Sequence, residues 1–274
     1  MDRIKQALDR ARSEREAATN DQAADNGSKN AKKSGHAGSS TPQITYSQTK
    51  IANLDKQLLR ANRVIYGSED RSGLAAYKML RTQVLQRMTA HGWNALAVTS
   101  PGQNEGKSLT AINLAISLAR ELHHTVLLVD MDLRKPSIHK YFGITPEKGI
   151  GDYLLRDASL SDILVNPGIE RLVLLPGTDS IENSSEILAS PAMGSLVQEL
   201  KARYPSRMVL FDLPPVLPAD DALSFVPFVD AFLLVLKEGQ VTRTELKHTM
   251  EIMKEAMIIG TVLNGSNERV STYY

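Results

Sequence analysis

The sequence contains no cysteine among its 274 residues. This absence excludes disulfide bonds, thiolate catalysis and cysteine-based zinc sites, and it agrees with a reducing compartment. The six histidines are scattered, without the spacing of a metal cage. Long apolar runs are also missing, since stretches such as 231–236 are far shorter than the roughly 20 residues that cross a bilayer. The N-terminus is charged rather than hydrophobic, so we expect no secretory signal and a cytoplasmic location.

An excess of charge of either sign is missing as well. The 32 basic and 31 acidic side chains leave a formal net charge of +1. Such a balance gives no general attraction for nucleic acid or for an anionic membrane surface, and we expect no nucleic-acid partner. With 42% hydrophobic and 23% charged residues, the composition is that of an ordinary globular protein. The length suits one large α/β domain with a tail, or two small domains.

The first part of the chain divides into two segments. Residues 1–18 predict a short charged helix, because Ile4 and Leu8 lie four apart on one face. That helix is either solvated or a docking peptide for a partner protein, and the sequence leaves both open. Residues 19–53 predict a disordered linker, since no carboxylate occurs between Asn26 and Lys50 and Ile44 is the only large aliphatic there.

The folded domain is expected over residues 54–264, followed by a flexible tail over 265–274. A 3.6-residue apolar rhythm predicts a helix from about Ser72 to Ala90, and beyond it short apolar strands alternate with helices. The expected strands are Ala95–Thr99, Thr125–Asp130, Arg171–Leu175, Met208–Asp212, Ala231–Leu236 and Thr261–Asn264. The expected helices include Lys107–Glu121, Ser184–Tyr204 and Thr242–Met257, the last with a core-facing stripe of Leu246, Met250, Met253 and Met257. The alternation predicts an α/β fold with a mostly parallel sheet covered by helices on both faces.

The strongest local pattern runs from residue 97 to residue 108 and reads AVTSPGQNEGKS. A strand ends, a loop follows, and Gly-Lys-Ser opens a helix, which is typical of a phosphate-binding loop (P-loop). Lys107 is then expected to reach the nucleotide phosphates and Ser108 to bind Mg²⁺. The general pattern has Gly at the position of Pro101, and the alternative reading is a surface turn. Phosphate binding is expected from Gly102, Gln103, Asn104, Glu105, Gly106, Lys107, Ser108 and Leu109.

Two further strands end in carboxylates. Asp130 and Asp132 follow one of them, two residues apart and therefore on the same side of an extended backbone. If both ionise they need a neighbouring cation, and Mg²⁺ would serve. Asp212 ends the other strand just before Pro214-Pro215, where it would hold Mg²⁺ directly or through water. Each strand end alone could be a solvated turn, but the P-loop and two acidic ends in this order indicate a nucleotide site of the P-loop NTPase fold.

These motifs resemble the bacterial tyrosine kinases that partner polysaccharide chain-length regulators. The family shows a P-loop, then Asp-x-Asp-Leu-Arg-x-Pro-x-x-His-x-x-Phe, then Asp-x-Pro-Pro. Residues 130–142 match the second motif fully and include Arg134, His139 and Phe142. Residues 212–215 match the third, and Asp221 also falls where the family has an Asp. The resemblance covers about residues 74–264, and Pro101 is normal within it.

The resemblance implies a protein-tyrosine autokinase that uses ATP and Mg²⁺ and regulates exopolysaccharide or capsule chain length and export. Asp130 would accept the tyrosine proton, Asn264 would contact the adenine, and His139 would pack or hydrogen-bond rather than catalyse. The implied catalytic residues are Lys107, Asp130, Asp132 and Asp212, the implied metal ligands are Ser108, Asp130 and Asp212, and the implied phosphoacceptors are Tyr273 and Tyr274, modified in trans. The implied partners are a membrane polysaccharide co-polymerase that activates the kinase and recruits it to the inner face of the plasma membrane, a cognate phosphatase, and further copies of the chain.

The chain departs from the family in three places. A Glu-x-x-Arg-x-x-Arg frame used in ring assembly reads Ala75, Lys78 and Arg81 here. The tail carries two tyrosines rather than many, and the membrane-spanning half fused in some relatives is missing. Two other functions therefore stay open: a nucleotide-sensing scaffold that transfers nothing, and an ATPase switch of the partitioning class. The second would need an additional lysine where Gly102 stands.

Overall fold

The computed structural model describes residues 50–67, 70–121, 124–203 and 206–266. The predicted helix over 1–18, most of the predicted linker and the two tail tyrosines lie outside the described residues. The described residues belong to one compact unit.

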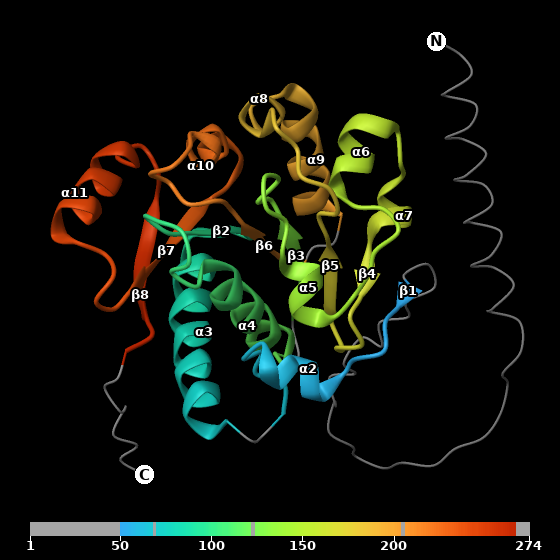
Figure 1. Cartoon of the computed structure of the whole chain (residues 1–274), viewed down its shortest axis with the longest axis horizontal. Helices are drawn as coiled ribbons and strands as arrows, with labels where there is room; N and C mark the ends of the chain where they lie inside the picture. Colours follow the sequence, from blue (N-terminus) through green and yellow to red (C-terminus); the bar gives the residue numbers. More distant parts are fainter. Residues whose placement is uncertain (1–49, 68–69, 122–123, 204–205, 267–274) are drawn as a thin grey trace, which may run out of the picture. The chain divides into compact units, whose positions relative to one another are not determined.

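Eight strands of the described chain form one twisted sheet (Figure 1). They are β1 (Lys50–Ile51), β2 (Ala95–Thr99), β3 (Thr125–Asp130), β4 (Val165–Asn166), β5 (Leu172–Leu175), β6 (Arg207–Asp212), β7 (Ala231–Lys237) and β8 (Ile258–Asn264). Their order across the sheet is β1-β4-β5-β3-β6-β2-β7-β8, and every neighbouring pair is parallel except β4 with β5. Strands β2, β5 and β6 are buried along their whole length, which requires apolar side chains on both faces.

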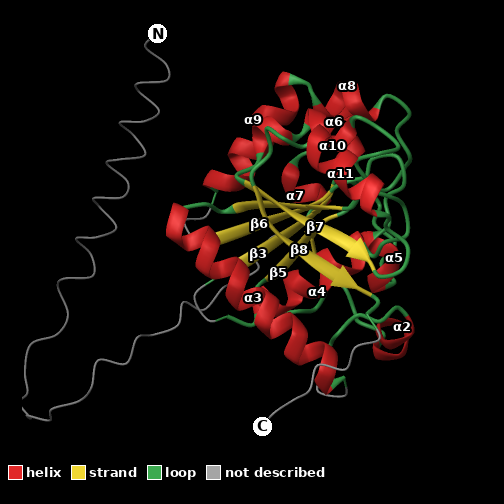
Figure 2. Cartoon of the chain, turned by 90° about the vertical axis from the view of Figure 1, so that its left-hand side faces the viewer, coloured by secondary structure: helices red, strands yellow, loops and turns green. Residues whose placement is uncertain are grey.

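Helices cover both faces of the sheet (Figure 2). One face packs against α2 (Lys56–Ala61), α3 (Arg71–His91), α4 (Lys107–Ala119) and α5 (Ile138–Phe142). The other packs against α6 (Ile150–Arg156), α7 (Leu160–Ile163), α8 (Ser184–Leu188), α9 (Pro191–Ala202), α10 (Asp221–Ser224), the 3₁₀ turn Val226–Phe228 and α11 (Arg243–Ile252). The predicted α/β class with a mostly parallel, doubly covered sheet is confirmed.

Two predicted helices differ from the structure. The helix expected over Ser184–Tyr204 is two helices, because Pro191 opens α9 and the Ser190 hydroxyl caps it by accepting a hydrogen bond from the Met193 amide at 3.2 Å. The helix expected to reach Met257 ends at Ile252, so its apolar stripe is interrupted. Met253 is buried, whereas Met250 and Met257 are 44% and 55% exposed, and the expectation that the whole stripe packs into the core is wrong.

The sheet begins within the range predicted as linker. Strand β1 pairs with β4, and the Ala52 amide donates to the Asn166 carbonyl at 2.9 Å. Strand β1 has only two residues, so it shows no alternation of apolar and polar residues by which a strand could be predicted from the sequence.

The sheet order determines where the site lies. Strands β3, β6 and β2 are adjacent and parallel, and the register places Asp130 opposite Asp212 and Val98 opposite Asp212. The carboxyl ends of the three motif-bearing strands therefore meet at one edge of the sheet, where ligands bind in open α/β folds.

Candidate functional site

The loop between β2 and α4 is held by contacts at both ends. Asn104 and Gly106 adopt left-handed conformations with φ of 62° and 90°. The Gly102 amide donates to Glu105 Oε1 at 2.7 Å, and Asn264 Nδ2 donates to the Glu105 carbonyl at 2.8 Å. Gly106 packs so closely against the Asn264 side chain that any Cβ there would collide with it. Asn264 of β8 therefore holds the loop that precedes α4 in place. Only glycine fits at position 106, where the loop backbone comes close to the Asn264 side chain.

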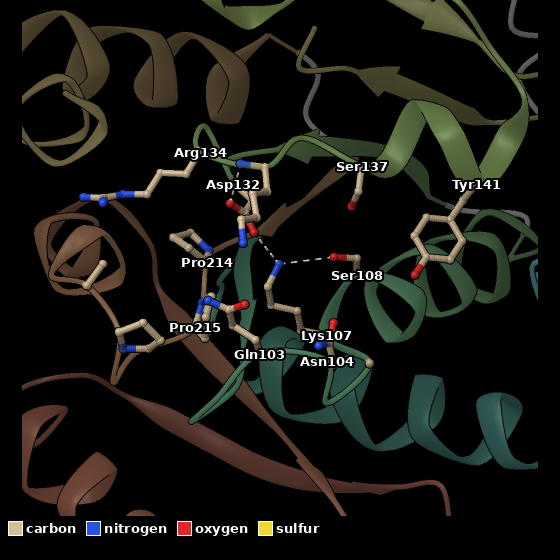
Figure 3. Close-up of a pocket in the computed structure, with 14 residues that line it drawn as sticks. Gln103, Asn104, Lys107, Ser108, Asp132, Arg134, Ser137, Tyr141, Pro214 and Pro215 are labelled. Carbon is tan, nitrogen blue, oxygen red and sulfur yellow. Dashed lines mark hydrogen bonds and ion pairs between the residues drawn. The ribbon is translucent and has the colours of Figure 1, made fainter. Parts of the chain in front are cut away.

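Lys107 lies at the centre of the site (Figure 3). Its ammonium is 2.9 Å from Asp132 Oδ2 and 3.5 Å from Asp212 Oδ1, and it donates to Ser108 Oγ at 3.2 Å. Burial lowers the Lys107 pKa, but the charges of Asp212 and Asp132 outweigh it and the pKa is raised. Lys107 is therefore charged at neutral pH, and carboxylates from two different strand ends hold it in place.

Asp130 and Asp212 are fully buried. Asp130 Oδ2 accepts hydrogen bonds from the Ser137 and Ile138 amides at 2.8 and 2.9 Å. Asp130 Oδ1 and both Asp212 oxygens accept no hydrogen bond from the described residues. Burial, reinforced by the charge of Asp212, raises the Asp130 pKa to about 7, and burial raises the Asp212 pKa despite the opposing charge of Lys107.

A pocket of 610 Å³ opens above these groups. Of the predicted site residues, Gln103, Asn104, Gly106, Lys107, Ser108 and Asp132 line it. Asp130 and Asp212 are buried and lie outside the lining, as do Gly102, Glu105 and Asn264. Leu109 packs its side chain against the hydrophobic core beneath α4. Burial raises the pKa of Glu105, whose carboxylate is turned into the loop, to about 7.

The pocket has other walls that the sequence reasoning did not assign to the site. Ser137 lies just before α5 and Tyr141 lies within it, and Pro214 and Pro215 come from the turn after β6 (Figure 3). Burial raises the Tyr141 pKa, and the charge of Asp212 adds to the effect. Only the motif spacing that places Ser137 and Tyr141 soon after Asp132 could have indicated them.

Arg134 lines the same pocket, and its guanidinium group is held by two buried residues. Its Nη2 lies 3.1 Å from Asp221 Oδ2, and its Nε donates to Ser184 Oγ at 2.8 Å. Asp221 and Ser184 are fully buried and hydrogen-bonded to each other. The matching Asp221 noted in the sequence thus anchors the arginine of the second motif. His139 of that motif lies outside the pocket lining, and burial lowers its pKa.

The residues present fit a nucleotide with a hard divalent cation. Asp130, Asp132 and Asp212 bring three carboxyl groups near one ammonium, and three of their oxygens are buried without hydrogen bonds. Oxygen donors of this kind suit Mg²⁺, which is held by one or two carboxylates together with substrate phosphates. Among the residues that the structure describes, no group of three or more histidine, aspartate or glutamate side chains is placed to hold a metal ion by itself.

Comparison with known proteins identifies the family. No protein-family model matches the chain. Over 191 residues the chain is 30% identical to the tyrosine-protein kinase YwqD of Bacillus subtilis, which covers 69% of this chain and 79% of the relative. The chain belongs to the bacterial tyrosine-protein kinases. The resemblance seen in the motifs is thereby confirmed, and with it the enzyme class of protein-tyrosine kinase.

Solved structures agree with this assignment. The kinase domain of the Escherichia coli tyrosine kinase ETK superposes with a TM-score of 0.69 at 26% identity, covering 82% of this chain and 92% of that domain. The septum site-determining protein MinD of Pyrococcus horikoshii, solved with Mg-ADP, gives a TM-score of 0.54 at 25% identity and covers 64% of this chain and 72% of that one. This bacterial tyrosine kinase thus has the P-loop NTPase fold. None of its described helices is long and apolar enough to cross a membrane.

Proposed function

We propose that this bacterial tyrosine kinase is an ATP-dependent autokinase that phosphorylates Tyr273 and Tyr274 in trans and so regulates the chain length and export of an exopolysaccharide or capsule. The observation that carries the proposal is the Lys107 ammonium, 2.9 Å from Asp132 and 3.5 Å from Asp212. Phosphoryl transfer depends on positioning and charge neutralisation more than on covalent chemistry by the protein. The Lys107 ammonium, held by Asp132 and Asp212 at the P-loop, would supply both the positioning and the charge neutralisation.

In this proposal Mg-ATP would provide the phosphoryl group and the metal charge that offsets the phosphate oxygens. The loop over residues 102–109 would hold the phosphates, and Lys107, which contacts Asp132 in the described structure, would supply its positive charge to them. Ser108, Asp130 and Asp212 would hold the metal, directly or through water. Asn264, which donates a hydrogen bond to the Glu105 carbonyl of the loop, would contact the adenine.

Asp130 is proposed as the group that accepts the proton of the tyrosine hydroxyl. A base works best when its pKa is close to the working pH, and burial brings the Asp130 pKa to about 7. Two backbone amides orient Oδ2. Oδ1, which accepts no hydrogen bond from the described residues, is therefore the oxygen proposed to take the proton, with Asp130 holding the metal through water. Asp130 is fully buried in the described structure, so a tyrosine hydroxyl reaches it only after a local rearrangement.

The partners follow from the same proposal. A membrane polysaccharide co-polymerase activates the kinase and recruits it from the cytoplasm to the inner face of the plasma membrane, and a cognate phosphatase resets the tail. Within the assembly frame, Arg81 is bound inside the chain, 2.8 Å from Glu121 and donating to the Ser117 carbonyl at 3.2 Å. Lys78 and Ala75 are exposed on α3. Contacts between copies through the exposed face of α3 would therefore involve other side chains than in relatives that carry the full Glu-x-x-Arg-x-x-Arg frame.

The proposal is tested by incubating the full chain with Mg-ATP, with and without the membrane partner, and locating phosphate by mass spectrometry. Phosphotyrosine at Tyr273 and Tyr274 is expected in the wild type and absent in Lys107→Met. A tail that stays unmodified while ATP still binds would favour the nucleotide-sensing scaffold. ATP hydrolysis without any phosphotyrosine would favour the partitioning-type switch.

A further inference from the structure

Glu105 is a buried acidic residue of the loop between β2 and α4, and the proposed function gives its side chain no role. The residue is only 3% exposed. Its Oε1 accepts a hydrogen bond from the Gly102 amide at 2.7 Å, and its Oε2 is buried and makes no hydrogen bond with the described residues. A carboxyl group therefore lies inside the loop that is expected to hold phosphates.

The contacts of the loop carbonyls show which way its backbone faces. Gln240 Nε2 donates to the Gln103 carbonyl at 3.0 Å, and Asn264 Nδ2 donates to the Glu105 carbonyl at 2.8 Å. In a trans peptide the C=O and the N–H that follows it point in opposite directions. The two amides that follow these carbonyls therefore point away from Gln240 and Asn264, and the residues that carry them line the pocket. The Gly102 amide differs, because it is bound by the Glu105 carboxyl group.

The charge of Glu105 determines whether this arrangement favours phosphate or opposes it. An ionised oxygen that is buried without a donor costs far more free energy than a neutral one in the same place. Burial raises the Glu105 pKa to about 7 against the lowering effect of the Gly102 amide, while Glu245 of α11 raises this pKa and Lys237 of β7 lowers it. The Lys107 ammonium contacts carboxylates of two other strand ends instead. Glu105 is thus divided between its neutral and ionised forms near neutral pH.

We propose that Glu105 is a positioning residue of the P-loop that acts in its neutral form, in which the carboxyl group holds the Gly102 amide without placing a negative charge beside the phosphates. Both forms can accept the amide hydrogen bond, because a protonated carboxyl group keeps acceptor capacity. Only the ionised form repels the phosphates, and this repulsion is strong where water is excluded. A nucleotide that binds the neutral form more tightly must in turn raise the Glu105 pKa. The inference rests on the nucleotide binding of the proposed function and adds a dependence on pH to it.

The test measures the affinity of the full chain for a non-hydrolysable ATP analogue with Mg²⁺ at pH 6 and at pH 8. With a pKa of about 7, the neutral fraction of Glu105 falls from about nine-tenths to about one-tenth, so wild-type affinity should fall by up to about tenfold. Glutamine is neutral and keeps the oxygen acceptor. Glu105→Gln should therefore bind like the wild type at pH 6 and up to about tenfold more tightly than the wild type at pH 8. Alanine lacks the acceptor, so Glu105→Ala should bind more weakly than Glu105→Gln at both pH values.

Two controls separate Glu105 from other titrating groups. Asp130 and the phosphates of the analogue are the same in every variant, so the difference between the pH profiles reports on Glu105 alone. Glu199→Gln makes the same substitution on an exposed side chain of α9, on the other face of the sheet, and should reproduce the wild-type profile. Circular dichroism shows whether each variant is folded.

Identical pH profiles of the wild type and Glu105→Gln would overturn the proposal, as would weaker binding by Glu105→Gln at pH 8. Equal binding by Glu105→Gln and Glu105→Ala would remove the positioning role. Carboxyl-carbon NMR of the wild-type chain labelled in glutamate needs no variant. One glutamate signal should titrate well above the ordinary value of about 4, and the analogue should raise its midpoint, whereas a midpoint that stays at the ordinary value contradicts the inference. A chain that binds no analogue at either pH would contradict the proposed function itself, whereas binding with identical profiles contradicts only this inference.

Discussion

Replacing Lys107 by methionine removes the one ammonium that the Asp132 and Asp212 carboxylates share. In the proposed complex that ammonium binds the β- and γ-phosphates. Each hydrogen bond to a charged group contributes about 1.5–3 kcal/mol, so two of them amount to a loss of about 3–6 kcal/mol, or roughly 10²- to 10⁴-fold in ATP affinity. Isothermal titration with Mg-ATP measures this loss directly.

The same variant has a stability signature. Breaking a buried ion pair costs about 3–5 kcal/mol when the remaining charge stays ionised. Burial already raises the pKa of Asp130 and Asp212, and removing the ammonium raises that of Asp212 further, so a proton can replace the lost charge. The deficit in unfolding free energy should therefore be smaller at pH 6 than at pH 8, and the domain should remain folded.

Lys201→Met provides the matched control. Lys201 lies 2.6 Å from Asp230, in an ion pair that is also partly buried but lines no part of the nucleotide pocket. This variant should lose stability without losing ATP affinity. If Lys107→Met bound Mg-ATP like the wild type, or if the control lost as much affinity, the reasoning about the site would be refuted.

Three other changes test separate parts of the account. Asp212→Ala and Asp132→Ala should each weaken the Mg²⁺ dependence of nucleotide binding, and wild-type Mg²⁺ titrations in both would show that these carboxylates do not serve the metal. Asp130→Asn should remove a pH dependence of stability. The Asp130 pKa is about 7 in the folded state and about 4 in an unfolded chain, so its protonation stabilises the fold fully below about pH 4 and this contribution is lost as the pH rises through 7. Urea unfolding at several pH values should show that slope in the wild type and a smaller one in the variant. An unchanged slope would mean that another group titrates. Deleting residues 1–46 should leave ATP affinity intact, since β1 begins at Lys50, and a lost nucleotide site would show that the domain starts earlier.

Sequence alone predicted six of the eight described strands and many of the residues that line the pocket at the P-loop, because these depend on local patterns. Apolar strands such as Val126–Val129 are buried on both faces, and their carboxyl ends must meet in a parallel sheet. The residue spacing within the P-loop and at the acidic strand ends can be recognised without knowing the order of the strands in the sheet. The structure brings these motifs together and places the Lys107 ammonium between Asp132 and Asp212.

Other features depended on contacts between distant residues. The anchoring of Arg134 by Asp221 and Ser184 joins three segments, and the sequence showed the partners without their pairing. Tyr141 reaches the nucleotide pocket only because α5 turns back along α4, and β1 is defined only by its pairing with β4. The burial of Asp130 also could not be predicted from a residue that ends a strand.

The proposed reaction transfers phosphate from ATP to the tail tyrosines of another copy. Its most direct measurement mixes two full-length chains with Mg-ATP and the membrane partner: Lys107→Met, which keeps its tyrosines, and an otherwise intact Tyr273→Phe/Tyr274→Phe chain. Mass spectrometry should find phosphotyrosine at 273 and 274 of the Lys107→Met chain in the mixture, and none when that chain is incubated alone. If the Lys107→Met tail stays unmodified in the mixture although the other chain binds Mg-ATP, the chain does not phosphorylate its tail in trans and the account is contradicted.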